Sequence, residues 1–288
     1  MTLTLDPVAT FERARSGMVR ERRRRSGLFA AAFLLAVVVS GWVGEVNLTN
    51  LATGIPGALG YIAATLPSLR LGSLGADLAD WFWALDRWLL LLVDTIVIGF
   101  LATVMGTAAA FLLSFAAARN LSPNRTLCFV TRRVLEIARS VPELVYAMIF
   151  VFAFGLGPLA GVMAIALHTA GALGKLFSEV NENADLRPLD GTLAAGADWF
   201  QGMRYAIVPQ VLPNFASYTL LRFEINVRSA TVIGFVGAGG IGQELMFVIR
   251  QFVYQDISAI VLLIILLVCI IDVTCERIRH NFARPGAT

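Results

Sequence analysis

Hydrophobic and polar positions follow one another along this chain in long blocks rather than in short periods. Long apolar stretches lie at residues 27–44, 95–118, 144–174, 214–236 and 257–275. A bilayer core about 30 Å thick needs about 20 residues of helix, so most of these lengths fit membrane-spanning helices. The pattern therefore predicts an all-α integral membrane protein.

The stretch at 144–174 is long enough for two spans and contains a break at Gly155-Leu156-Gly157-Pro158. Proline has no backbone donor and glycine is flexible, so this break predicts a tight turn between spans three and four. The third span is then expected to begin early, near Ser140 to Glu143. Counted in this way, the chain has about six transmembrane helices.

Composition supports the membrane class and excludes several kinds of site. The chain is 57% hydrophobic and only 15% charged, whereas a soluble domain carries about 25% charged residues. It has no G-x-x-x-x-G-K-[ST] loop, no nucleophile-and-base set and no metal-ligand spacing, so we expect neither an enzyme nor a bound cofactor. Cys128, Cys269 and Cys275 are expected to be free, small apolar residues.

Basic residues set the expected orientation. If the N-terminal tail is cytoplasmic, the inside loops and tails carry 18 of the 23 Lys and Arg residues, whereas the outside segments carry only Arg70, Arg87 and Arg250. This asymmetry follows the positive-inside rule and predicts that both termini are cytoplasmic. The basic run Arg20 to Arg25 then reports topology rather than nucleic-acid binding, because a span follows it at once.

A polar segment between apolar spans is the strongest functional signal. Trp199, Met203 and Ile207 recur there every four residues and form an apolar stripe on a predicted short helix that ends at Pro209. This stripe can pack on the chain's own spans or in a partner's groove, and we favour the partner's groove.

The same segment resembles the cytoplasmic coupling loop of ABC importer permeases, whose pattern is E-A-A-x3-G-x9-I-x-L-P. Gly196 is followed by nine residues and then Ala206-Ile207-Val208-Pro209, and Asp190 stands six residues before Gly196. The spacing is kept although Asp-Gly-Thr replaces Glu-Ala-Ala. In that family the loop sits in a groove of the ATP-hydrolysing subunit.

Three further stretches resemble the permeases of phosphonate importers, with methionine importers second. They are residues 224–242, 139–144 and 167–176, and the resemblance covers about residues 90–280. It implies a type I ABC importer permease fold in a bacterial inner membrane. It also implies three protein partners: ATP-binding cassette subunits, an extracytoplasmic substrate-binding protein and a second copy of the chain. Phosphonate, phosphate and phosphite stay open as substrates, and a self-standing carrier is the alternative without an ATPase.

Hydropathy and charge, together with this resemblance over residues 90–280, divide the chain into consecutive segments. We expect a basic cytoplasmic tail, a first span, an outside interfacial segment, the permease domain with its coupling loop, and a C-terminal tail, at 1–26, 27–44, 45–87, 88–280 (loop 181–213) and 281–288.

Charged residues in the predicted fifth span point to a translocation path. A charge at mid-bilayer costs about 2.5–3.5 kcal/mol on insertion scales, so it faces a cavity or a partner. Glu224 and Arg228 have the spacing of an ion pair. They can merely neutralise each other, or Arg222 and Arg228 can line the path of an anion, since guanidinium matches phosphorus oxyanions. We expect His168 to be a core residue, and Glu143 to serve capping or packing.

The glycines after this span form a misleading motif. Gly237, Gly239, Gly240 and Gly242 include the pattern G-x-G-x-x-G of a dinucleotide-binding fold. That fold needs several alternating strands and helices, and the remaining residues are mostly span six. We expect instead a flexible outside turn or a helix break lining the path, with Gly237, Gly239 and Gly240 letting backbones approach or change angle.

Overall fold

The computed structural model describes residues 7–67, 70 and 72–282. Every regular element in these ranges is helical, as predicted, and the chain divides into two compact units, Met1–Ala63 and Ala64–Thr288. The helices are α1 Pro7–Val43, α2 Leu48–Thr65, α3 Leu74–Trp81, α4 Leu85–Ala117, α5 Arg125–Ser140, α6 Glu143–Phe154, α7 Pro158–Glu182, α8 Arg187–Ala194, α9 Trp199–Gly202, the π-helix η1 Met203–Ile207, α10 Val208–Ile233, the 3-10 helix η2 Gly234–Val236, α11 Ile241–Arg250 and α12 Tyr254–Phe282.

The first unit holds α1 and most of α2. The expected boundary between a tail and a span at 26/27 lies inside α1, which is one helix through the arginine run. Arginine is a good helix former, so the basic residues extend the helix instead of ending it. Glu21 and Arg25 pair along it at 2.5 Å. The described part of the predicted C-terminal tail reaches only residue 282.

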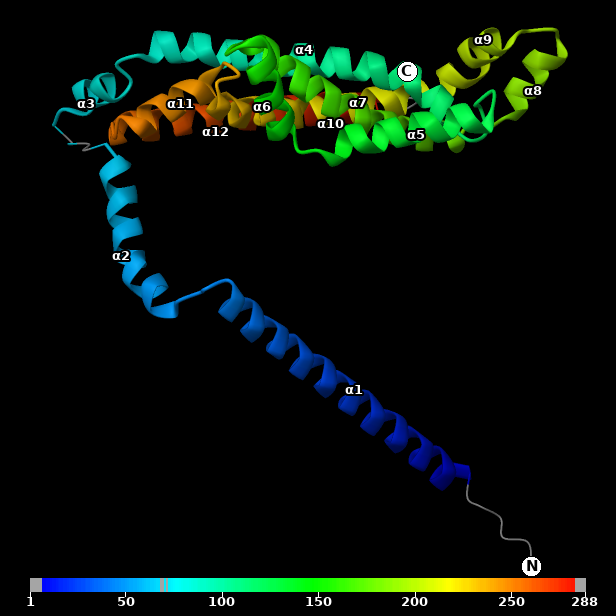
Figure 1. The fold of residues 1–288 in the computed structure, drawn as a ribbon, viewed down its shortest axis with the longest axis horizontal. Helices are drawn as coiled ribbons and strands as arrows, with labels where there is room; N and C mark the ends of the chain where they lie inside the picture. Colours follow the sequence, from blue (N-terminus) through cyan, green and yellow to red (C-terminus); the bar gives the residue numbers. More distant parts are fainter. Residues whose placement is uncertain (1–6, 68–69, 71, 283–288) are drawn as a thin grey trace, which may run out of the picture. The chain divides into compact units, whose positions relative to one another are not determined.

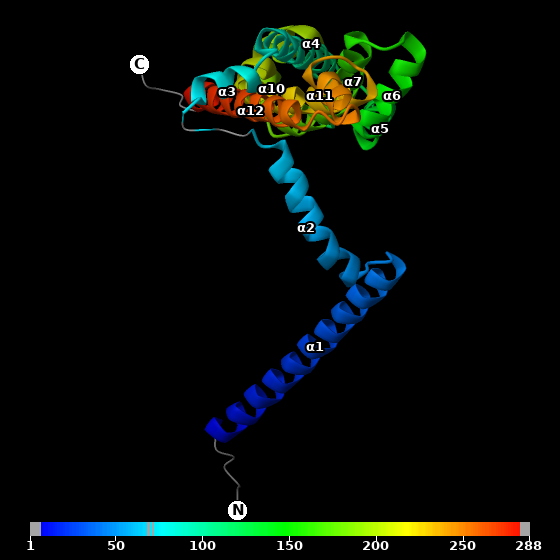
Figure 2. The ribbon, with the colours of Figure 1, turned by 90° about the vertical axis from the view of Figure 1, so that its left-hand side faces the viewer.

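The second unit is a bundle built around α4, α7 and α10. Glycines allow these helices to approach closely: a Cβ at Gly99 would meet Val227 at 2.8 Å, and one at Gly106 would meet Thr169 at 2.7 Å. Figure 1 shows α8 and α9 at one end of this bundle and α3 at the other, and Figure 2 looks onto the end with α3 and α11. The long helices therefore place the polar loop at one end of the bundle.

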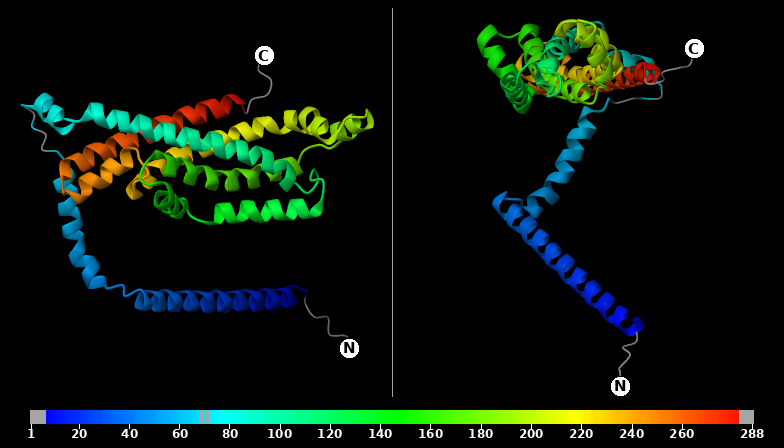
Figure 3. Two further views of the ribbon diagram at one scale, coloured as in Figure 1. Left: turned by 45° about the horizontal axis from the view of Figure 1, so that its top comes forward. Right: turned by 90° about the vertical axis from the view of Figure 1, so that its right-hand side faces the viewer.

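Within the described residues, four helices are long and apolar enough to cross a membrane, and the number is six if each of two bent helix pairs forms one span. The predicted start of span three, near Ser140 to Glu143, coincides with the start of α6 at Glu143. The α6 helix has only 12 residues, about 18 Å, so it is long enough for a span only together with α5, which meets α6 at 88° (Figure 3). Pro142 caps the start of α6, because the residue before a proline and the proline itself interrupt helical geometry.

The predicted turn between spans three and four is confirmed. Gly155 and Gly157 have φ values of +88° and +145°, and Pro158 opens α7 in its first turn. A left-handed φ favours glycine, and proline fits the first helical turn because its missing N–H would lack a helical partner there.

Candidate functional site

The polar loop between α7 and α10 is a helical hairpin rather than an irregular connection. The α8 helix ends before Gly196, whose φ of +92° reverses the chain. Asp198 then caps α9: its side chain accepts from the Gln201 N–H at 2.7 Å, and the Gln201 side chain accepts from the Asp198 N–H at 3.0 Å. The reversal at Gly196 and the cap at Asp198 thus fix where the second helix begins.

The stripe predicted on this second helix faces the protein's own core. Met203 and Ile207 are buried, and Trp199 donates its indole N–H to the carbonyl of Leu121 at 2.9 Å. All three pack in one apolar cluster with residues of α4 and α7. The interpretation that this stripe fits a partner's groove is therefore wrong, because the helix continues into α10 and its stripe continues the inward face of that span.

The exposed face of the hairpin carries different side chains. Leu193, Phe200 and Tyr205 are exposed, Phe200 by 75%, and the Arg204 guanidinium lies 5.6 Å from the centre of the Tyr205 ring. We call these four residues the hairpin surface. Asp190 and Gly196 are exposed on the same hairpin. The sequence analysis missed Phe200 and Tyr205, two aromatic residues of the same helix that lie outside the inward stripe.

Pro209 does not end the helix, in contrast to the prediction. The five residues before Val208 form a π-helix, in which the Val208 N–H bonds to the carbonyl of Met203. A π-bulge accommodates an extra residue within a continuing helix, so the missing donor of Pro209 is tolerated. The second helix of the hairpin and the span are therefore one continuous helical rod from Trp199 to Val236.

The two ends of the hairpin are tied together. The Gln210 side chain donates to the carbonyl of Asp185 at 3.1 Å and accepts from the Asp185 N–H at 3.1 Å. Arg187 donates to the Asp185 carboxylate, and this hydrogen bond and ion pair lower the pKa of Asp185. The start of the hairpin is thus tied by hydrogen bonds to the start of α10.

Within the bundle, Arg222 is held by an ion-pair cluster. Its guanidinium donates to the Glu143 carboxylate at 2.6 Å and contacts His168 Nδ1 at 2.5 Å and Thr169 Oγ1 at 3.3 Å. The Arg222 side chain is 12% exposed. Arg222 therefore joins α10 to α6 and α7 instead of standing free in a path. His168 is packed as expected, whereas the role of Glu143 was missed.

A buried polar seam continues from this cluster. Asn226 accepts from Thr169 at 3.1 Å and donates to Thr103 at 2.8 Å. Thr103 in turn donates to the carbonyl of Gly99 at 2.6 Å. Buried polar groups that satisfy one another fix how α4, α7 and α10 align, because any sliding would leave them unpaired.

The predicted ion pair of Glu224 and Arg228 is confirmed, at 3.4 Å. Arg228 also lies 3.7 Å from Asp272 of α12, and its side chain is 52% exposed. The Arg228 guanidinium therefore stays partly exposed beside its two carboxylates, whereas the Arg222 guanidinium is enclosed by its partners.

The glycine-rich segment is a packed turn and not a nucleotide site. Residues 231–236 are helical where the dinucleotide motif needs a strand. Gly237, Gly239 and Gly240 all have positive φ. A Cβ at Gly240 would lie 2.6 Å from Thr95 Oγ1, and this hydroxyl accepts the Ile241 N–H at 2.9 Å. Gly240 therefore permits close packing on α4, whereas Gly237 and Gly239 lie against Leu156 and Pro158. The segment is thus a packed helix break rather than a flexible turn.

Comparison with known proteins gives a consistent family. Residues 102–284 match the family described as binding-protein-dependent transport system inner membrane component. The chain is 37% identical to the phosphite transport system permease protein PtxC of Stutzerimonas stutzeri, over 90% of each chain. It is 36% identical to the phosphate-import permease protein PhnE of Mycolicibacterium smegmatis, over 68% of this chain and 37% of that one.

Solved structures agree at the level of the fold. A chain of the MetNI methionine ABC transporter covers 70% of this chain and 98% of its own length, with a TM-score of 0.57 and 22% identity. A chain of a bacterial alginate ABC transporter covers 93% and 100%, with a TM-score of 0.61 and 11% identity. The chain therefore belongs to the binding-protein-dependent transport system inner membrane components, as a non-catalytic, multi-pass permease subunit of an ABC transporter.

Proposed function

We propose that this permease serves the import of a small phosphorus oxyanion: phosphite, a phosphonate or phosphate. The observation that carries this is the 37% identity with a phosphite-system permease over 90% of both chains. The methionine transporter shares the fold at 22% identity, and a fold alone does not set the substrate. ATPase subunits and an extracytoplasmic binding protein complete the transporter, and two copies of this chain enclose the path.

The proposed ATPase-docking element is the hairpin within residues 181–213. Its contact face is the hairpin surface of Leu193, Phe200, Arg204 and Tyr205, with Asp190 and Gly196 beside it. Exposed aromatic and arginine side chains are the kind that dominate binding energy at protein interfaces. Trp199, Met203, Ile207 and Pro209 serve on the other side of the hairpin, where they join it rigidly to α10.

This rigid joint supports a mechanism for coupling. A hairpin displaced by ATP-driven closure of its partners moves α10 as well, because the π-helix and the Gln210–Asp185 contacts leave no loose connection. The α10 helix carries Arg222, Glu224 and Arg228, so a movement at the hairpin reaches the charged region of the span. The path then alternates between inward and outward openings.

Arg228 is the proposed substrate contact within the path. Its guanidinium is half exposed and makes only long contacts with Glu224 and Asp272. A binding site on a transport path must be weak enough for release, and one arginine partly neutralised by two carboxylates fits that requirement. Arg222 is proposed to hold α10 in place, and Gly237, Gly239 and Gly240 to fix the outer end of the path.

The proposed orientation places both termini in the cytoplasm. It follows from the basic residues of the N-terminal helix and from the hairpin, which must face the ATPase. The segments at 1–26, 27–44, 45–87, 88–280 and 281–288 keep their proposed roles as tail, first span, outside segment, permease domain and tail.

Reconstitution with the ATPase and the binding protein tests the substrate. We expect proteoliposomes to take up labelled phosphite, methylphosphonate or phosphate with ATP, and unlabelled oxyanion to compete. Methionine is the matched alternative ligand. Uptake of methionine without oxyanion uptake would contradict the proposal, as would oxyanion uptake by the permease alone.

A further inference from the structure

A basic hollow lies where α4 ends and α5 begins. Its cavity measures about 580 Å³, and its lining includes four arginines, Arg119, Arg125, Arg132 and Arg133. The hairpin is its neighbour, because the indole of Trp199 donates to Leu121 in the α4–α5 connection. The proposed orientation therefore puts the hollow at the cytoplasmic end of the bundle.

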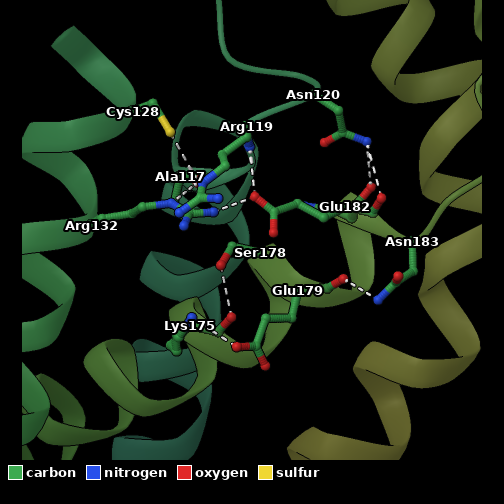
Figure 4. Close-up of polar contacts among 11 residues, drawn as sticks. Ala117, Arg119, Asn120, Cys128, Arg132, Lys175, Ser178, Glu179, Glu182 and Asn183 are labelled. Carbon is green, nitrogen blue, oxygen red and sulfur yellow. Dashed lines mark hydrogen bonds and ion pairs between the residues drawn. The ribbon is translucent and has the colours of Figure 1, made fainter. Parts of the chain in front are cut away.

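One wall of the hollow is fixed by hydrogen bonds (Figure 4). The Arg132 side chain donates through Nε to the carbonyl of Ala117 at 2.7 Å and through a terminal nitrogen to Glu182. The same Glu182 oxygen accepts the Arg119 N–H at 2.9 Å, and the Cys128 thiol donates to Ala117. Arg132 is thus held in place, and its charge is matched by one carboxylate.

The other arginines leave an excess of positive charge. Among the described residues, no carboxylate lies within ion-pair distance of Arg119 or Arg125. Arg133 pairs with Glu136 at 2.5 Å, so the four arginines of the lining have two carboxylate partners, Glu182 and Glu136. Several guanidinium groups around one cavity are suited to the charge and planar hydrogen bonding of a phosphate group.

The apolar surface next to the hollow indicates which phosphate compound fits. Phe129, Val130, Val134 and Ile137 are exposed along α5, which together with α6 is apolar and long enough for one bent span. A soluble anion would use the arginines and leave this face unused. A phospholipid would use both, with its headgroup at the arginines and its acyl chains along α5.

We propose that this hollow binds the phosphate headgroup of an acidic phospholipid. Basic pockets between spans at the cytoplasmic surface attract such headgroups. The site is separate from the proposed substrate path at Arg228. The proposal rests on the orientation proposed above and not on the identity of the transported oxyanion.

Native mass spectrometry of the full-length chain in mild detergent tests this. The probes are phosphatidylglycerol and, for comparison, phosphatidylcholine. The test variant is Arg125→Gln/Arg133→Gln, which spares the fixed Arg132–Glu182 wall. At about fivefold per arginine, the double variant should bind phosphatidylglycerol about 25-fold more weakly. Arg139→Gln, an exposed arginine at the other end of the same helix, is the matched control and should bind normally.

Four results would overturn the proposal. The first is equal binding of phosphatidylcholine and phosphatidylglycerol. The second is unchanged binding of phosphatidylglycerol by the double variant. The third is a double variant that keeps lipid binding but loses its ATPase, which would assign the arginines to that partner. Inorganic phosphate that binds as tightly as the lipid would likewise exclude a role for the α5 face. None of these results would contradict the proposed substrate, because the uptake assay tests the substrate separately.

Discussion

Arg222 and Arg228 are six residues apart on α10 and have opposite environments. Arg222 is 12% exposed and has partners on two other helices, at 2.5–2.6 Å from His168 and Glu143. Arg228 is 52% exposed and lies 3.4 Å and 3.7 Å from its carboxylates. A charged residue within a span thus cannot be assigned a function from its position alone. The partners decide whether the residue holds helices together or remains available to a ligand.

The largest expected effect comes from breaking the Arg222 cluster. Arg222→Ala leaves the Glu143 carboxylate without its guanidinium, with His168 Nδ1 at 2.8 Å as a remaining contact, and removing one partner of a buried ion pair costs about 3–5 kcal/mol. We expect low yield and a clearly lower unfolding temperature in detergent. The double variant Glu143→Leu/Arg222→Met removes both charges and should recover much of the stability. An Arg222→Ala protein as stable as the wild type would contradict the structural role that separates Arg222 from Arg228.

The hairpin shows the same contrast, between a buried side chain, Met203, and an exposed one, Phe200. Phe200→Asp should weaken ATPase binding about thirtyfold, since an interface hot spot is worth about 2 kcal/mol, and should leave the fold intact. Binding of the purified ATPase and thermal unfolding measure the two effects. Phe247→Asp changes an exposed aromatic on α11, at the other end of the bundle, and is the control.

Met203→Ala is the inward counterpart in the hairpin. It should lower the free energy of unfolding by about 2–5 kcal/mol, as expected for a buried methionine, before it affects docking. Normal ATPase binding by Phe200→Asp together with lost binding by a stably folded Met203→Ala would reverse our assignment of the two faces.

A smaller effect is expected at Arg228. Arg228→Ala should assemble normally but reduce uptake at low oxyanion concentration about tenfold, equivalent to one charge-assisted hydrogen bond of about 1.5 kcal/mol. Uptake by proteoliposomes measures this, with Arg250→Ala at the end of α11 as the exposed-arginine control. Unchanged uptake in Arg228→Ala would remove it from the path.

The smallest effect concerns Asp185 at the base of the hairpin. Its hydrogen bond and ion pair with Arg187 lower its pKa below the ordinary 3.8. A lowered pKa stabilises the fold above the unfolded pKa, and this contribution is lost as pH falls through the folded pKa. Wild type should therefore unfold at a slightly higher temperature than Arg187→Gln at pH 5–7, and the difference should shrink below about pH 4. A difference that grows on acidification would contradict this.

Local patterns carried much of what could be predicted. The spans follow from apolar length, the turn before α7 from Gly155 and Pro158, and the Glu224–Arg228 pair from helical spacing. Each of these depends on residues close in sequence. The motif spacing around Gly196 also led to the family.

Long-range contacts could not be predicted in this way. Glu143 and Arg222 are 79 residues apart, and no spacing rule joins them. The inward direction of the hairpin stripe depends on the π-helix that carries α9 past Pro209. Amphipathic periodicity locates a stripe on a helix, but only the tertiary fold decides whether the protein's own core or a partner covers it.

Cysteine accessibility compares the two arginine positions most directly. In a chain with Cys128, Cys269 and Cys275 replaced by alanine, Arg228→Cys and the paired variant Glu143→Leu/Arg222→Cys are assembled with the ATPase and treated with a charged methanethiosulfonate. We predict fast labelling at position 228, slowed by phosphite, and slow labelling at 222. Equal labelling at both positions, or labelling at 228 that the oxyanion does not protect, would contradict the separation of a structural and a substrate-facing arginine.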